Sequence, residues 1–137
     1  MTAPHIRTIE QDVPAVAAGS DQNTVALECQ FQGTVTAVTF VPAAAITGAA
    51  TNNRTLSLVN KGAAGSGSTS IASLTFNNGT NASANVETAI TLSGTASNLN
   101  VSAGDVLQWQ SVHNGTGIAD PGGLVRVTIS RTSSQWP

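Results

Sequence analysis

The residues able to do chemistry are few in this chain and lie far apart in the sequence. His5 lies close to the start, and His113 follows a predicted strand and precedes turn-forming residues. Asp105 lies in a Ser-Ala-Gly-Asp turn and Asp120 precedes a proline, positions at which carboxylates commonly accept backbone N–H bonds. A strand-end histidine is more often a surface polar group than a catalytic base, so we expect these side chains to have structural roles.

A metal site in this chain would need Asp105, His113 and Asp120 to meet in space. Their spacing matches none of the usual ligand patterns for zinc or calcium. The sequence also contains no Gly-x-Ser-x-Gly elbow, no phosphate-binding loop and no dinucleotide fingerprint. We therefore expect no catalytic residue, no cofactor and no metal, which is typical of a protein that is not an enzyme.

Cys29 is the only cysteine, which excludes an internal disulfide bond. It shares the inward face of a predicted strand with Val25, Leu27 and Phe31, so we interpret it as a small hydrophobic residue of the core. A nucleophilic thiol would need a neighbouring base, and the two histidines of the chain are distant in the sequence.

The composition excludes further classes of protein. Only 9% of the 137 residues are charged and the net charge is −2, so no basic cluster is present to bind a nucleic acid backbone. No apolar run approaches the roughly 20 residues that a membrane-spanning helix needs. The first residues lack the charged-then-apolar order of a signal peptide, so we expect synthesis in a cytoplasm.

Segments that alternate apolar and polar residues follow one another along most of the chain, separated by Gly, Asn and Ser. This period of two predicts strands at residues 24–32, 34–41, 54–60, 70–76, 86–94 and 124–132. Residues 98–112 contain a Gly-Asp turn and then a further strand. We expect a hairpin across Gly33, pairing of 54–60 with 70–76 across a long loop, and at most one helical turn at 43–46. The pattern predicts an all-β fold, an antiparallel β-sandwich or jelly roll of seven or eight strands.

The predicted strands also indicate which side chains form the core. Leu107 and Trp109 share one face of their strand, and we expect both to point inward. In the last strand the inward residues are expected to be Val125, Val127 and Ile129.

Residues 1–23 differ from the rest of the chain. They hold three of the seven acidic residues and two of the five prolines, without a sustained period. We interpret them as an extended N-terminal arm, with at most a short strand at residues 5–9, in front of a sandwich domain of residues 24–137.

The plan of an extended arm and a helix-free sandwich of very low charge resembles the decoration or minor capsid proteins that tailed bacteriophages place outside their heads. The C-terminal stretch NLNVSAGDVLQWQSVHNGTGIADPGGLVRVTISR, residues 98–131, carries the same resemblance. It implies a noncatalytic virion protein, made in the host cytoplasm, that docks on the assembled major capsid protein. The resemblance also implies a homo-oligomer, often a trimer at local threefold positions.

The arm and the C-terminal end supply the candidate assembly contacts. Extended arms can add a strand to the edge of a neighbouring sheet, and an aromatic side chain near a polar end often anchors another subunit. The candidates are Ile6, Ile9, Val13, Val16 and Trp136. The alternative function is a carbohydrate-binding or host-attachment module on the same fold, which would need an exposed aromatic platform, although aromatics make up only 4% of the chain.

Overall fold

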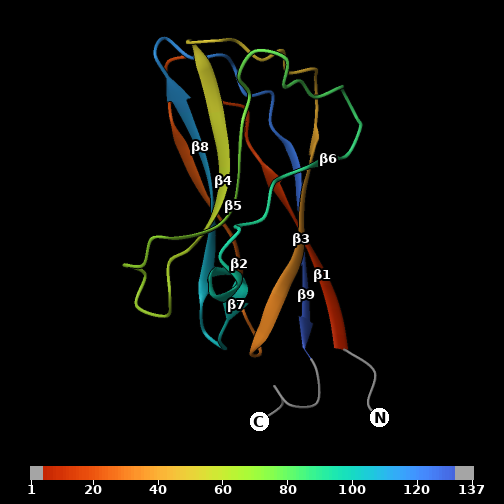
Figure 1. Ribbon diagram of the computed structural model, residues 1–137, viewed down its shortest axis with the longest axis vertical. Coiled ribbons are helices and arrows are strands. Elements are labelled where there is room, and N and C mark those ends of the chain that lie inside the picture. Colours follow the sequence, from red (N-terminus) through yellow and green to blue (C-terminus); the bar gives the residue numbers. More distant parts are fainter. Residues whose placement is uncertain (1–4, 132–137) are drawn as a thin grey trace.

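The computed structural model describes residues 5–131, which form nine strands and one short 3-10 helix (Figure 1). The elements are β1 (His5–Val13), β2 (Gln22–Glu28), β3 (Gly33–Pro42), β4 (Asn53–Asn60), β5 (Thr69–Thr75), β6 (Thr88–Ala89), η1 (Ala96–Leu99), β7 (Asn100–Val101), β8 (Val106–Asn114) and β9 (Gly123–Arg131). No helix of the described part is long and apolar enough to cross a membrane.

The strands form two antiparallel sheets that pack face to face. The first sheet has the order β1-β9-β3-β6, with β7 also paired to β3, and the second has the order β2-β8-β4-β5. The predicted all-β fold and the β-sandwich are therefore confirmed. The described residues contain nine strands where seven or eight were expected, because the residues before the Gly-Asp turn form the additional short strand β7.

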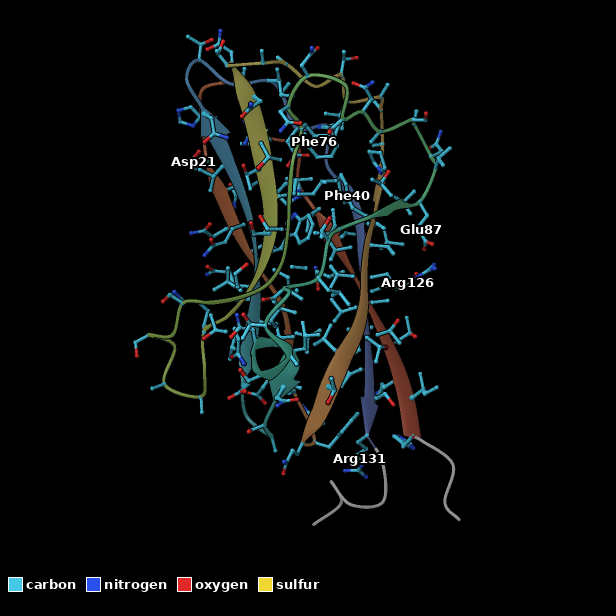
Figure 2. The ribbon with its side chains drawn as sticks, viewed as in Figure 1. Asp21, Phe40, Phe76, Glu87, Arg126 and Arg131 are labelled. Carbon is cyan, nitrogen blue, oxygen red and sulfur yellow. The ribbon has the colours of Figure 1, made fainter. Side chains whose placement is uncertain are left out.

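The core lies between the sheets and is built by the alternation that the sequence shows. Figure 2 shows Phe40 of the first sheet and Phe76, which follows β5, in the space between the layers. The expected inward residues of β8 and β9 are confirmed, since each is at most 2% exposed: Leu107, Trp109, Val125, Val127 and Ile129. The ring of Trp109 lies 5.6 Å from that of Phe40, which joins the two layers at their centre.

The expected hairpin across Gly33 is wrong. The strand before Gly33 pairs with β8 in the second sheet, whereas β3 pairs with β9 in the first. The chain therefore crosses from one layer to the other at this point. The expected pairing of β4 with β5 across a long loop is confirmed.

A β-bulge changes which residues of β2 face inward. The pairing with β8 shifts between Val25 and Leu27, so Ala26 and Leu27 are both buried. Val25 was expected in the core but is 58% exposed, because the bulge moves it to the outer face.

Two further segments are less regular than expected. Within residues 86–94 only Thr88–Ala89 is a strand, while Ile90 is buried and Leu92 makes an isolated bridge to Ala72. Residues 43–46 contain bends and a bridge from Ile46 to Ala82 instead of a helical turn. The Asn- and Gly-rich stretches around these residues favour turns over a continuous ladder.

Much of the expected arm is an integral strand of the sandwich. The expected short strand at residues 5–9 extends to Val13, and all nine residues of β1 pair with β9. Figure 1 shows β1 beside β9 at the outside of the first sheet. Residues 14–21, called the linker below, then carry the chain across to β2 in the second sheet.

Candidate functional site

The two aspartates predicted to stabilise turns do so. The carboxylate of Asp105 accepts hydrogen bonds from the backbone N–H of Ser102 at 2.9 Å and from Nδ2 of Asn60 at 3.0 Å. Asp120 accepts a bond from the backbone N–H of Gly122 at 2.8 Å. Each carboxylate is therefore used in fixing a local turn.

His113 is held by a carboxylate that the sequence analysis did not connect with it. Oδ1 of Asp21 accepts the backbone N–H of His113 at 2.9 Å and lies 2.6 Å from the ring Nδ1. The backbone hydrogen bond, followed by the side-chain bond, lowers the pKa of Asp21 below its ordinary value. The pair joins the end of the linker to the end of β8.

The structure does not bring together Asp105, His113 and Asp120, the three residues that a metal site would have needed. Within residues 5–131, no three side chains of His, Cys, Asp or Glu form a group that could hold a metal ion. His113 contacts Asp21, Asp120 lies in a different polar cluster, and His5 packs edge-on against Phe31 at 5.7 Å between ring centroids. The contacts of His113, Asp120 and His5 are therefore structural ones.

Cys29 lies in the core, as predicted. It is 2% exposed, and burial together with the carboxylates of Asp105 and Glu28 raises its pKa to about 12. The thiolate is the reactive form of cysteine, so the thiol is inert near neutral pH in the folded protein.

The most extensive polar cluster is centred on Arg54, which is 1% exposed between the sheets. Its NH1 donates to Oγ of Ser111 at 3.0 Å, and that hydroxyl donates to Oδ2 of Asp120 at 2.6 Å. Asp120 is 2% exposed, so a buried cation and a buried anion are joined through one hydroxyl group. Burial lowers the pKa of Arg54 and the nearby carboxylates oppose this shift, so the guanidinium remains protonated.

The remaining donors of Arg54 fasten the linker to the second sheet. Its Nε donates to the carbonyl of Ile118 at 2.8 Å. Its NH2 lies 2.9–3.1 Å from the carbonyls of three linker residues, Ala17, Ala18 and Ser20. One side chain thus satisfies three backbone acceptors of a segment without regular structure. We call Arg54, Ser111 and Asp120 the clamp.

The sequence does contain a signal for the clamp. Arg54, Leu56 and Leu58 are spaced two residues apart, which places the side chain of Arg54 on the same inward face of β4 as the two leucines. A charged side chain that points into the core is rare without a partner. The position of Arg54 in the sequence therefore predicts a buried hydrogen-bond acceptor near it. Its partners could not be found by spacing, because Ser111 and Asp120 come from distant parts of the chain.

The expected assembly contacts of the N-terminal segment divide into two groups. Ile6 is 63% exposed on the outer face of β1, and Ile9 is partly buried against the core. Val13 and Val16 are 7% and 8% exposed, so they belong to the interior of this chain and offer no surface to a partner. Trp136 lies outside the described residues.

The outer face of the first sheet carries a small group of charges. Arg126 of β9 binds Glu10 of β1 at 2.9 Å and Glu87 at 2.9 Å, and Thr39 donates to the same Glu87 carboxylate at 3.1 Å. Figure 2 shows Glu87 and Arg126 on this outward side. These side chains are about half exposed, so the ion pairs stabilise the fold only slightly.

The outer face of the second sheet is different in character. The outward residues of three of its four strands, β8, β4 and β5, are uncharged. Hydroxyl groups pair across β4 and β5, Thr55 with Thr75 at 2.8 Å and Ser57 with Ser73 at 3.0 Å. We call the solvent-facing residues of β8, β4 and β5 the neutral face: Gln108, Gln110, Val112, Thr55, Ser57, Ser73 and Thr75.

The described aromatic residues lie mainly inside the sandwich. Phe40, Phe76 and Trp109 are buried, and Arg131 lies over the ring of Phe31 at 4.6 Å from its centroid.

Comparisons with known protein families, curated proteins and solved structures found no match to this chain.

Proposed function

We propose that this chain is a noncatalytic structural protein that binds the outside of an assembled bacteriophage capsid and reinforces or decorates it. The observation that carries this proposal is the neutral face, together with the structural contacts made by Asp21, Asp105, Asp120 and His113. The partner in this proposal is the major capsid protein. This chain acts as a homo-oligomer, such as a trimer, and resides on the virion surface after synthesis in the host cytoplasm.

A neutral polar face suits an interface that is repeated many times over a shell. Burying a charge in an interface carries a large desolvation penalty, which hydroxyl and amide groups largely avoid. The hydroxyls bond in pairs, Thr55 with Thr75 and Ser57 with Ser73, so one donor of each pair keeps its acceptor when a partner covers the face. The first sheet offers a less suitable surface, because Glu10, Glu87 and Arg126 would have to be desolvated there.

The alternative function is a carbohydrate-binding or host-attachment module. Such sites stack sugars on exposed aromatic rings, and the large aromatic side chains of the described residues are buried or covered. The neutral face could supply hydrogen bonds to a glycan but has no ring for stacking. The alternative therefore enters the experiment below as a competing outcome.

The test is co-sedimentation of purified protein with capsids of the phage that encodes it, assembled without this protein. Deleting residues 1–18 would remove strand β1, so point variants are the better probe. Ser57→Arg places a charge in the neutral face, and Thr36→Arg is the matched control on the outer face of the first sheet.

We expect the wild-type protein and Thr36→Arg to co-sediment with capsids and Ser57→Arg to lose binding. Equal binding of the two arginine variants would contradict the assignment of the neutral face. Absence of wild-type binding to capsids, together with binding to purified host cell-wall glycans, would overturn the capsid proposal in favour of the alternative function.

A further inference from the structure

Strand β1 is attached to the rest of the molecule mainly through the backbone of β9. In the described part of the chain β9 is its only strand neighbour, and the ladder covers all nine residues. Of its side chains, only Val13 at its end is buried, and Ile9 packs partly against the core. The side-chain bonds to β9 are exposed: the hydroxyls of Thr8 and Thr128 are 3.4 Å apart, and Glu10 binds Arg126.

The linker that follows β1 is fastened by side-chain as well as backbone hydrogen bonds. Val16 and Asp120 exchange two backbone hydrogen bonds of 2.8 and 2.9 Å, and Arg54 binds three linker carbonyls. Pro14 stands directly between Val13 and this fixed segment. The hydrogen bonds of the linker do not involve β1, so β1 can separate from β9 without breaking them.

The free edge of β1 is poorly suited to receive a new strand. Arg7 lies on one face of the strand, and Glu10 and Asp12 lie on the other. Charged residues on an edge strand are a common protection against the addition of another strand. The edge of β9 is different, because its side chains already match those of β1, with Arg126 placed to meet Glu10.

We propose that β1 is exchanged between two copies of this chain, so that β1 of one copy pairs with β9 of the other in the same antiparallel register. Exchange of an identical element re-forms the same bonds between molecules, which makes it a low-cost route to association. In this register Val13 of one copy lies opposite Gly123 of the other, so Pro14 of each copy must lie beside β9 of its partner. This inference goes beyond the proposed function, because it concerns links between copies and requires no capsid.

Disulfide trapping in purified protein tests the exchange. One chain carries Thr8→Cys and an isotope label, and an unlabelled chain carries Thr128→Cys; the two positions are directly opposite in the ladder. The chains are mixed, incubated at high concentration and oxidised. The native Cys29 is buried and does not take part. A second pair, Ile6→Cys with Ser130→Cys, reports on the same ladder.

A matched control measures disulfides formed by random collision. Thr55→Cys and Thr75→Cys, on separate chains, occupy opposite positions of β4 and β5, where the native hydroxyls are 2.8 Å apart. For each pair, the double variant on one chain shows whether the geometry allows a disulfide.

We expect a labelled–unlabelled species of twice the chain mass from both β1–β9 pairs, in large excess over the β4–β5 control. The proposal is overturned if the β1–β9 mixtures give no more of this species than the control while their double variants close within one chain. Because no capsid is present, this result is independent of the capsid-binding experiment.

Discussion

Replacing Arg54 with methionine tests whether the clamp is a main determinant of stability. Methionine keeps most of the side-chain volume but removes five hydrogen bonds, of 2.8–3.1 Å, to one hydroxyl and four carbonyls. It also leaves the Asp120 carboxylate, 2% exposed, without its cation. Arg54 and Asp120 interact through the Ser111 hydroxyl, and removing one of two such buried charges typically costs about 3–5 kcal/mol of unfolding free energy. We expect a loss of this size for Arg54→Met.

The assay is equilibrium unfolding in urea at neutral pH, followed by tryptophan fluorescence. Arg126→Met is the matched control, because it removes the same charge from exposed ion pairs and should change the unfolding free energy only slightly. The double variant Arg54→Met/Asp120→Asn should lose less unfolding free energy than the sum of the two single variants, because each buried charge compensates the other. Equal stability of Arg54→Met and Arg126→Met would refute the reasoning.

Three further predictions concern single residues. The pKa of Asp21 is lowered in the fold, so its contribution to stability is present above its ordinary pKa of 3.8 and is lost as the pH falls through the lower folded value. Unfolding measured from pH 2 to 7 should therefore converge for wild type and Asp21→Asn at the acid end. Cys29, with a pKa of about 12, should resist alkylation at pH 8 in the folded protein and react fully in urea; rapid reaction without urea would contradict its burial. Gly117 has a φ of 73° and an added Cβ would collide with the carbonyl of Ala18, so Gly117→Ala should lose at least about 1 kcal/mol in urea unfolding. Gly19→Ala meets no atom within 4 Å and should change stability by less than about 0.5 kcal/mol; equal losses would contradict the close packing of the linker.

The local pattern predicted individual strands better than it predicted their partners. The alternation in β9 correctly placed Val125, Val127 and Ile129 in the core, because a period of two needs only neighbouring residues. The same reasoning placed Val25 in the core, where a bulge against β8 turns it outward. A bulge depends on the partner strand, and that partner is 80 residues away in the chain.

The N-terminal segment shows a second limit of the sequence. We interpreted residues 1–23 as an arm because of their prolines and charges, and charged residues do lie on β1. They are compatible with an edge strand, where half of the side chains face solvent and the free edge benefits from charge. The strand forms because β9 supplies nine backbone partners, which no pattern within β1 can indicate.

The sequence by itself determined that this protein is all-β, nearly uncharged on its body and built with a core of small and branched apolar residues, because these properties depend on composition and on a repeat of two. The tertiary structure decided which sheet each strand joins and gave Arg54 its partners from the linker, β8 and the segment before β9. The physical reason is that hydrogen-bonded ladders and buried charge pairs join residues far apart in the chain. Their free energy therefore depends on the whole fold being formed.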